Sequence, residues 1–414
     1  MTTPTIVPTG EPTMRRRFQL TNLDGNNNKY YMVETWSLPD SSVFFRATYG
    51  RVGSRPQIDE KITTEAVVER KIREKQKKGY QEVALHRPSV IATASDADIT
   101  LPPKVQQLVD FIYSEAGEKI ASYLAVGLDA LSQEQIERGR KLLMLAQGQF
   151  TTWQQSQTPA NVQLLAGTVQ TFYNTIPTQL PARMEREQVI RDFCKAFDEQ
   201  EDRLNQLEAA IATAAIQKND PRASRYDALG AELALLPESD TAYGEITDSI
   251  ARTCVHGYRV RVRDIFTVHV PDERRAFEQN TRGRKRVERL FHGTAGHNVR
   301  HIMRSGLICP RTPSNGRMFG HGIYFANKVS KSANYCSTRS RHTPQFLFLA
   351  DVAIGRPYVA SQAMPDLRKP PFLHDSVWGK AGHTGAWNSK LLFDEHIIYH
   401  AAQQTLRYLV TFER

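Results

Sequence analysis

The segment from Met318 to Tyr335 constrains this chain more than any other part of its sequence. It reads Met-Phe-Gly-His-Gly-Ile-Tyr-Phe-Ala-Asn-Lys-Val-Ser-Lys-Ser-Ala-Asn-Tyr. The apolar run 322–326 predicts a strand, and the residues after it predict a helix. Tyr324, Ser332 and Tyr335 therefore fall on one strand and the helix that follows it. Aromatic faces and a hydroxyl can hold a flat polar ring, so the segment predicts a binding site for such a ring.

Two other short segments complete a pattern with this one. Leu-Phe-His-Gly-Thr contains His292, and Leu-Leu-Phe-Asp-Glu-His-Ile-Ile-Tyr contains Glu395. Each alone is ordinary: a turn, a buried strand, or the acidic start of a solvated strand. Together and in this order they resemble the His-Tyr-Glu pattern of the poly(ADP-ribose) polymerases, and residues 318–335 resemble that family's nicotinamide-binding block. The resemblance implies an enzyme that transfers ADP-ribose from NAD⁺.

The same resemblance implies a role for each site residue. Glu395, His292 and Tyr324 would be catalytic, and Glu395 would bond the 2′-hydroxyl of the nicotinamide ribose and polarise the attacking group. The residues implied to bind NAD⁺ are His292, Gly293, Thr294, Tyr324, Ser332 and Tyr335. Lys331 is a possible support for the charge of Glu395, with a solvated lysine as the alternative. NAD⁺ is expected as a substrate, with no tightly bound cofactor and no metal.

The N-terminal part of the chain has a β pattern followed by a basic helix. Segments 29–36 and 43–49 are rich in β-branched and aromatic residues, which predicts strands. Segment 64–78 predicts a helix that ends at Gly79-Tyr80. The expected apolar face of this helix consists of Ala66, Val67 and Ile72.

Within this part, Tyr49-Gly50-Arg51 resembles the Trp-Gly-Arg signature of the WGR domain, a small α+β module that senses DNA ends. The resemblance implies that Tyr49, Gly50 and Arg51 bind DNA, with Tyr49 in place of the family's tryptophan. An aromatic ring can pack on a sugar and an arginine can bind a phosphate. A tight glycine turn is the alternative interpretation.

The middle of the chain has helical periodicity. Val105, Leu108, Val109 and Ile112 recur at helix spacing, and Ser132 with Gln135 forms a capping-box pattern. A long helix is expected from about Glu185, with one face made of Ile190, Phe193, Phe197, Leu204, Leu207 and Ile211. These features resemble the all-α regulatory bundle of the same family, which hinders NAD⁺ entry until DNA is bound.

The charge is distributed unevenly along the 414 residues. Residues 1–90 carry 15 basic and 10 acidic residues, residues 91–240 carry 13 and 21, and residues 241–414 carry 26 and 13. The net charges are therefore +5, −8 and +13. Basic modules favour an anionic partner, although a merely soluble surface has the same charge pattern.

These patterns predict a multidomain chain with short, turn-separated strands in its last part, which favours an α+β domain with mixed or antiparallel sheets over a doubly wound one. The expected division is a disordered leader (1–14), a WGR DNA-binding domain (15–90), a linker (91–100), a helical regulatory domain (101–235) and an ADP-ribosyltransferase catalytic domain (240–414).

Cysteine usage and hydropathy indicate the compartment. The four cysteines, Cys194, Cys254, Cys309 and Cys336, form no Cys-x-x-Cys pair, so reduced buried thiols are expected. No apolar run reaches the roughly 20 residues of a membrane helix, and no signal segment is recognisable at the N-terminus. We expect an intracellular, DNA-associated protein, in a nucleus or on a nucleoid according to its source.

The leading hypothesis is a poly(ADP-ribose) polymerase that is activated by DNA strand breaks, modifies protein acceptors including itself, and elongates the chain with release of nicotinamide. Two alternatives stay open: a mono(ADP-ribosyl)transferase, which the presence of Glu395 disfavours, and a DNA-end-binding scaffold with weak catalysis. A secreted ADP-ribosylating toxin is disfavoured by the absence of a recognisable signal segment. The expected partners are broken DNA and protein acceptors, with no membrane, and the chain is expected to be monomeric off DNA.

Overall fold

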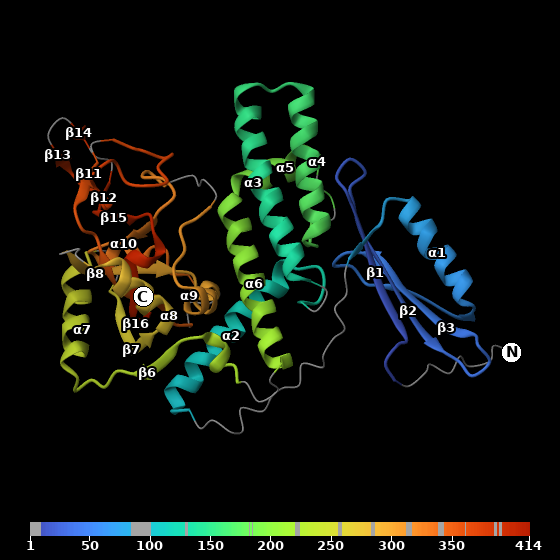
Figure 1. Cartoon of the computed structure of the whole chain (residues 1–414), viewed down its shortest axis with the longest axis horizontal. Helices are drawn as coiled ribbons and strands as arrows, with labels where there is room; N and C mark the ends of the chain where they lie inside the picture. Colours follow the sequence, from blue (N-terminus) through green and yellow to red (C-terminus); the bar gives the residue numbers. More distant parts are fainter. Residues whose placement is uncertain are drawn as a thin grey trace. The chain divides into compact units, whose positions relative to one another are not determined.

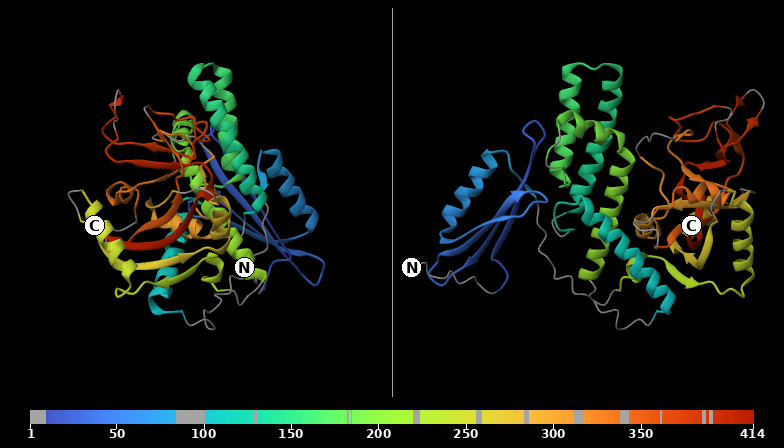
Figure 2. Two further views of the ribbon diagram at one scale, coloured as in Figure 1. Left: turned by 60° about the vertical axis from the view of Figure 1, so that its left-hand side comes forward. Right: turned by 180° about the vertical axis from the view of Figure 1, so that it is seen from behind.

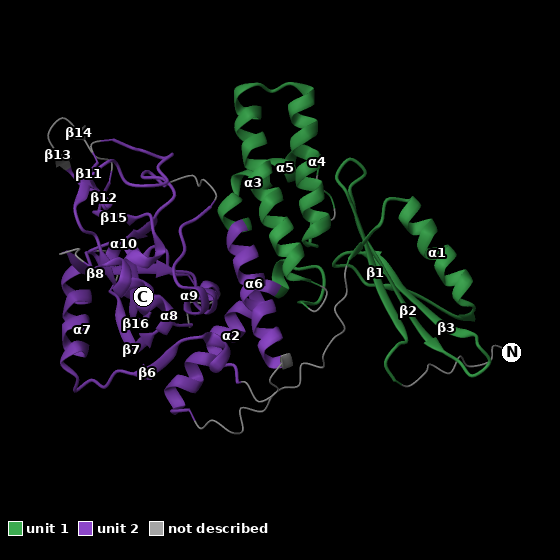
Figure 3. Cartoon of the chain, in the orientation of Figure 1, with its two compact units in different colours: residues 1–90, 121–200 green, residues 91–120, 201–414 purple. Residues whose placement is uncertain are grey.

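The computed structural model describes most of the chain (Figure 1). The described residues are 10–83, 101–128, 131–181, 183, 185–219, 224–255, 259–282, 286–311, 317–337, 343–360, 362–384, 387–388 and 391–414. Residues 1–9 of the expected leader and all of the expected linker lie outside them. The chain divides into two compact units, one of residues 1–90 and 121–200 and the other of residues 91–120 and 201–414 (Figure 3). The two units are described separately below.

The first unit contains an antiparallel sheet of five strands. The strands are β1 (Met14–Asn22), β2 (Asn27–Ser37), β3 (Val43–Arg51), β4 (Gln57–Thr63) and β5 (Gln81–Val83), in the spatial order β4-β3-β2-β1-β5. Helix α1 (Glu65–Lys77) lies across one face of this sheet, as the views in Figures 1 and 2 show. The first strand begins at Met14, which the expected leader had included.

Helix α1 packs on the sheet through a narrower apolar stripe than the sequence predicted. Its buried residues are Val68 and Ile72, whereas Ala66 is exposed and Val67 is half-buried. The expected apolar face was therefore wrong at Ala66, because Val68 and Ile72 are four residues apart and share the face that meets the sheet, whereas Ala66 does not. The core under the helix consists of Phe18, Tyr31, Val33, Val43, Phe45, Ala47, Val68 and Ile72.

Three helices complete the first unit: α3 (Gln133–Gln155), α4 (Pro159–Thr175) and α5 (Arg186–Lys195). The predicted capping box at Ser132 and Gln135 is confirmed, with both reciprocal hydrogen bonds present. The single long helix expected from Glu185 is wrong. It is interrupted at Ala196, where α5 ends with φ −120° and ψ 32°, and α6 (Phe197–Asn219) begins.

The second unit is built on two sheets. The larger contains β6 (Glu232–Leu235), β7 (Arg261–His269), β16 (Gln404–Glu413), β10 (Gln345–Ala353) and β8 (Val287–Thr294), in that spatial order. The smaller contains β11 (Pro357–Val359), β12 (Ser376–Gly379), β15 (Glu395–Ile398) and β9 (Ile323–Phe325), in that order. Only β11 and β12 pair in parallel among these strands, and the rest pair antiparallel. The expected α+β class with mixed and antiparallel sheets is confirmed.

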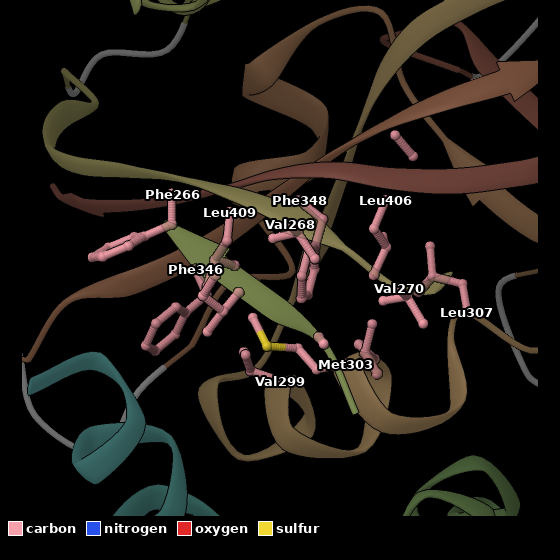
Figure 4. Close-up of a cluster of buried hydrophobic side chains, with 14 of the residues drawn as sticks. Phe266, Val268, Val270, Val299, Met303, Leu307, Phe346, Phe348, Leu406 and Leu409 are labelled. Atoms are coloured by element: carbon pink, nitrogen blue, oxygen red, sulfur yellow. The ribbon is translucent and has the colours of Figure 1, made fainter. Parts of the chain in front are cut away.

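Four helices surround these sheets: α7 (Thr241–Thr253), α8 (Pro271–Asn280), α9 (Val299–Ser305) and α10 (Val329–Ala333). Figure 4 shows Met303 of α9 pointing toward the side chains of the larger sheet, with Phe266, Val268 and Phe348 among them.

Helix α2 (Pro103–Tyr123) contributes to this same core. Its residues Val105, Leu108, Val109 and Ile112 are buried in one cluster with the larger sheet. The Lys104 ammonium also lies 2.9 Å from Asp264 of β7. Residues 103–112, together with β6, fall within the range expected to be a helical domain (101–235), yet they pack with the larger sheet of the second unit.

Candidate active site

The candidate active site forms where the two sheets of the second unit meet. An isolated antiparallel bridge joins Phe291 of β8 to Ala326, just after β9. Its two backbone hydrogen bonds are 2.9 and 3.0 Å long. The bridge places the segment Leu290–Thr294 beside Tyr324, so two segments that lie more than thirty positions apart in the sequence become neighbours.

His292 is held by this arrangement in one tautomer. Its Nδ1 lies 3.0 Å from the backbone carbonyl oxygen of Tyr324. A carbonyl only accepts, so Nδ1 carries the proton and Nε2 keeps a lone pair. Burial lowers the pKa of His292, which keeps the ring neutral. His292 can therefore accept a hydrogen bond from a ribose hydroxyl through Nε2.

Gly293 is required by the packing of α10 against β8. A Cβ at this position would collide with the carbonyl oxygen of Ser332 and lie 2.6 Å from its carbonyl carbon. Both are backbone atoms, which cannot move away as a flexible side chain would. The close approach places the Ser332 side chain next to β8, where its hydroxyl donates to the Phe291 carbonyl oxygen at 3.0 Å.

The two tyrosines of the candidate site differ in their surroundings. The hydroxyl of Tyr324 accepts from the Phe319 backbone N–H and donates to the Gly320 carbonyl oxygen, each at 3.0 Å. Burial raises its pKa. Tyr335 is 58% exposed, so its ring is available to a ligand. Thr294 is buried at the end of β8.

Glu395 is the first residue of β15 and forms an ion pair with Lys331 of α10. β15 pairs with β9 so that Ile397 lies opposite Tyr324, which brings Glu395 to the same end of the site. The Glu395 side chain is 8% exposed and that of Lys331 is 23% exposed. Burial lowers the pKa of Lys331, but the hydrogen bond and charge of Glu395 outweigh it and raise that pKa. The sequence-based alternative of a solvated lysine is therefore wrong.

Sequence reasoning missed the residues that support Tyr324. Tyr399, just after β15, donates its hydroxyl to the Phe319 carbonyl oxygen at 2.5 Å. Gly320 has φ +77° and lies against the backbone of Leu367, where a Cβ would clash. The glycines around residue 320 are a weak sequence signal for this tight turn, but the partner Tyr399 carries no such signal.

Within the second unit, helix α6 packs near α9. The Gln206 amide donates to the Asn298 side-chain oxygen at 2.8 Å, and Arg300 donates to the Ala209 carbonyl oxygen at 3.3 Å. The Glu201 carboxylate accepts from the Arg311 backbone N–H at 2.8 Å. These contacts connect one face of α6 to residues 298–311, which include α9 and follow β8 in the sequence.

The WGR signature residues lie within the first unit. The Arg51 guanidinium donates to the backbone and side-chain oxygens of Asn26 at 2.7 and 3.2 Å, and to the Pro181 carbonyl oxygen at 2.9 Å. The Tyr49 ring packs 5.9 Å from the Tyr31 ring. Gly50 lies beside the backbone of Arg55 and Pro56. The contacts of Arg51 connect a hairpin turn to the segment before α5, and its phosphate contact stays a prediction.

A lysine cluster stands on the same side of the sheet as α1. The Lys75 ammonium lies 4.3 Å from the Tyr31 ring centroid, 5.6 Å from that of Tyr49 and 5.4 Å from that of Tyr80. Burial and the charges of three other lysines, Lys78, Lys71 and Lys29, lower its pKa. Such repulsion is relieved by a bound polyanion, so this cluster is a candidate surface for nucleic acid.

Among the residues that the structure describes, no group of three or more His, Cys, Asp or Glu side chains could hold a metal ion. None of the four cysteines forms a disulfide, and Cys254 and Cys309 are half-buried rather than buried. None of the described helices combines the length and apolar character required to cross a membrane.

Comparisons with known proteins agree with this geometry. The model of the poly(ADP-ribose) polymerase catalytic domain matches residues 241–414, and that of the WGR domain matches residues 14–86. "Poly [ADP-ribose] polymerase 2-A" of Oryza sativa subsp. japonica is 28% identical over 94% of this chain and 68% of its own length.

Other relatives are longer than this chain. "Poly [ADP-ribose] polymerase" of Drosophila melanogaster is 28% identical over 61% of this chain and 29% of its own length. "Poly [ADP-ribose] polymerase 1" of Danio rerio is 26% identical over 80% of this chain and 35% of its own length. The chain thus matches about a third of these two relatives. It belongs to the poly(ADP-ribose) polymerase family and carries a WGR domain and the catalytic domain of an NAD⁺ ADP-ribosyltransferase.

Proposed function

We propose that the chain is a DNA-break-activated poly(ADP-ribose) polymerase that uses NAD⁺. The observation that carries this proposal is the Lys331–Glu395 ion pair beside Tyr324, because it supplies a fixed negative charge next to a surface that can bind an aromatic ring. A scaffold without catalysis has no need for a buried carboxylate held in this way. The mono(ADP-ribosyl)transferase remains the second candidate.

Binding of NAD⁺ would begin with the nicotinamide ring between Tyr324 and Tyr335. Aromatic pairs of this kind contribute about 1 kcal/mol beyond burial. The Gly293 backbone and the Ser332 hydroxyl would hold the carboxamide, for which Ser332 would exchange its bond to the Phe291 carbonyl oxygen. His292 Nε2 and the Thr294 hydroxyl would bind hydroxyls of the adenosine ribose.

The reaction breaks the bond between the nicotinamide nitrogen and C1′ of its ribose. Positive charge then spreads over the ribose ring, and an acceptor oxygen forms the new bond to C1′ while nicotinamide leaves with the bonding electrons. Glu395 would bond the ribose 2′-hydroxyl and polarise the attacking hydroxyl, whose proton is released to solvent as the new bond forms. Lys331 would hold the Glu395 carboxylate in one orientation through their ion pair.

The response to DNA would begin in the first unit. The cluster of Lys29, Lys71, Lys75 and Lys78 would bind backbone phosphates, with Tyr49 and its neighbours beneath it. Arg51 connects the sheet to the segment at Pro181, so a change at the DNA surface could reach the helices of that unit. Helices in the range 101–235 would restrain NAD⁺ entry, and the α6 contacts at Asn298, Arg300 and Arg311 support this role.

The proposed partners follow from this activity: DNA with strand breaks, protein acceptors and the chain itself. The charge of residues 1–90, a net +5, supports the DNA partner, since basic modules gain affinity for phosphates. The proposed location is with DNA inside the cell.

Two measurements on the purified protein, each with and without nicked DNA, test the proposal. The first is a gel after incubation with labelled NAD⁺, and the second is the rate of nicotinamide release. We expect long, DNA-stimulated polymer from the wild type. Glu395→Gln keeps the shape of the side chain but removes its charge, and should reduce elongation by about a hundredfold or more while NAD⁺ binding persists. Single additions in place of polymer would favour the mono(ADP-ribosyl)transferase. No nicotinamide release under any condition would favour the scaffold.

A further inference from the structure

Strand β4 forms one edge of the sheet in the first unit. In the spatial order of the described strands it has β3 on one side and no strand on the other. Two large apolar side chains on this strand are exposed: Ile58 at 60% and Ile62 at 62%. An unpaired edge with exposed isoleucines is a template for another strand, and soluble proteins usually protect such an edge.

The sequence of β4 is nearly symmetric about its central residue. It reads Gln57-Ile-Asp-Glu-Lys-Ile-Thr63, so an antiparallel copy centred on Glu60 places each isoleucine opposite the other isoleucine. The same register places Asp59 opposite Lys61 at two symmetric positions. Strand pairing of this kind joins apolar pairs on one face of the sheet and opposite charges on the other face.

The surroundings of β4 favour this arrangement. Glu60 would meet its own copy, but its carboxylate already lies 2.6 Å from Arg46 of the neighbouring strand, which offsets the repulsion. Arg46 itself is held over the Trp36 ring at 5.3 Å. On the other face, contact with the Lys71 ammonium lowers the pKa of Lys61. The Asp59 carboxylate of the second copy would lie opposite Lys61 and would relieve this like-charge contact.

We propose that β4 pairs antiparallel with β4 of a second copy of this chain, about a two-fold axis through Glu60. The axis is perpendicular to the sheet, so each face of one sheet continues into the same face of its copy. Two five-stranded sheets become one continuous sheet, with an Ile58–Ile62 contact on each side of the axis. This dimer goes beyond the proposed enzymatic function and differs from the monomer that the sequence led us to expect.

Neighbouring registers are disfavoured because they pair isoleucine with a carboxylate. A two-fold axis through Asp59 would place Ile58 opposite Glu60, and it would place Asp59, which is ion-paired with Lys71 at 2.9 Å, opposite its own copy. An axis through Lys61 would place Lys61 opposite its own copy and Ile62 opposite Glu60. A register that places an even-numbered residue opposite an odd-numbered one would require the second copy to be turned over. Opposite faces of the two sheets would then be continuous. Only the register centred on Glu60 pairs isoleucine with isoleucine on one face of the sheet and Asp59 with Lys61 on the other face.

The contact is small, because it joins two strands of seven residues. Interfaces that bury less than about 1,200 Å² are typically weak or transient, so we expect a weak, reversible dimer. The association should therefore be visible as a concentration-dependent change in mass of the full chain, by sedimentation velocity without DNA or NAD⁺.

A pair of charge variants tests the register. Lys61→Asp alone would place two carboxylates opposite each other at each cross-strand pair, and Asp59→Lys alone would place two ammonium groups there. We expect each variant alone to weaken the dimer at least tenfold, and an equimolar mixture of the two to associate, because both cross-strand pairs then have opposite charges. Failure of the mixture to associate, or undiminished self-association of either variant, would overturn the proposal. Thermal melting checks that each variant is folded.

A cysteine variant provides a second test that does not depend on the ion pairs. Glu60→Cys would place two thiols opposite each other across the axis, at the spacing of an antiparallel cross-strand pair. Mild oxidation should join the chains through this residue. Ile58→Cys is the control, because Ile58 and its copy would be roughly 13 Å apart, four residues along the strands. Equal crosslinking of both variants, or of neither, would contradict the register.

Discussion

The Lys331 ammonium of α10 forms an ion pair with the Glu395 carboxylate at the start of β15. The partners come from segments that are 64 positions apart in the sequence, and β15 reaches this place because it is hydrogen-bonded to β9, the strand just before α10. A carboxylate that bonds a substrate hydroxyl must hold one orientation. The Lys331 ammonium provides this, because charge-assisted hydrogen bonds are stronger and shorter than neutral ones.

Lys331→Met should reduce kcat for nicotinamide release by about ten- to a hundredfold, because Glu395 loses the group that orients it. The methionine keeps an apolar stem of similar length. Binding of a nicotinamide analogue should change less than kcat, since Tyr324 and Gly293 are untouched. The matched control is Lys328→Met at the exposed start of α10, which should leave kcat unchanged. Equal kcat in wild type and Lys331→Met would remove Lys331 from the site.

Gly293→Ala should destabilise the catalytic unit by about 1 to 3 kcal/mol, because the added methyl group meets the Ser332 backbone. The displacement of α10 should also weaken NAD⁺ binding by tenfold or more. Thermal melting and a binding titration measure the two effects. The control is Gly244→Ala in α7, where a Cβ meets nothing within 4 Å, so it should be neutral or slightly stabilising. A fully stable Gly293→Ala variant would contradict this packing argument.

The segments of the site could be predicted from the sequence, because each carries its residues locally. The strand expected over 322–326, which carries Tyr324, is present as β9. The convergence of the site segments followed only from the family resemblance. No local pattern indicates the bridge between Phe291 and Ala326, which depends on how two sheets pack.

Other features could not be predicted because they depend on long-range burial. Helical periodicity at Val105–Ile112 identified a helix but not its partner, which is the catalytic sheet rather than a separate bundle. The break at Ala196 carries no Gly or Pro that would have indicated it. Arg51 matched a signature, but the oxygens of Asn26 and Pro181 that it binds are distant in sequence.

Arg51→Ala separates two roles for the WGR arginine. If the residue connects the hairpin turn to Pro181, its loss should reduce DNA stimulation of activity severalfold while DNA affinity stays within about twofold. Lys75→Ala with Lys78→Ala should instead weaken DNA binding and reduce the salt dependence of log K by about one per lost phosphate contact. Fluorescence anisotropy with nicked DNA at several salt concentrations provides both numbers. A loss of affinity in Arg51→Ala that matches the lysine variant would assign Arg51 to phosphate.

Glu273 makes the stability of the catalytic unit depend on pH. Its carboxylate accepts from the Leu406 backbone N–H at 2.6 Å and from Gln404 at 3.1 Å, and burial raises its pKa above the ordinary value of 4.5. As pH rises, Glu273 therefore ionises at a lower pH in the unfolded chain than in the folded one. The protonated group stabilises the fold below pH 4.5, and this contribution is lost as pH rises through the folded-state pKa. Glu273→Gln should therefore gain in Tm relative to wild type as pH rises through this window. The control is Glu278→Gln, an exposed residue of the same helix. A Tm difference that is constant with pH would contradict the argument.

Gln206 provides a direct test of restraint by the helical segment. A truncated chain that starts at residue 240 would lack α2 and β6, whose side chains are in the catalytic core, so a slow truncation would not distinguish restraint from misfolding. Gln206→Ala instead breaks one 2.8 Å hydrogen bond between α6 and Asn298 and leaves that core intact. If α6 restrains NAD⁺ entry, nicotinamide release without DNA should rise about five- to tenfold, the scale of a coupling of 1 to 1.4 kcal/mol. The rate with saturating nicked DNA should stay the same, because DNA would already have released the restraint.

The matched control is Gln188→Ala in α5, which should change neither rate. Among the contacts described, the Gln188 amide binds only the exposed Asp192. An unchanged DNA-free rate in a folded Gln206→Ala variant, measured beside that control, would show that this contact stabilises the fold without restraining the enzyme.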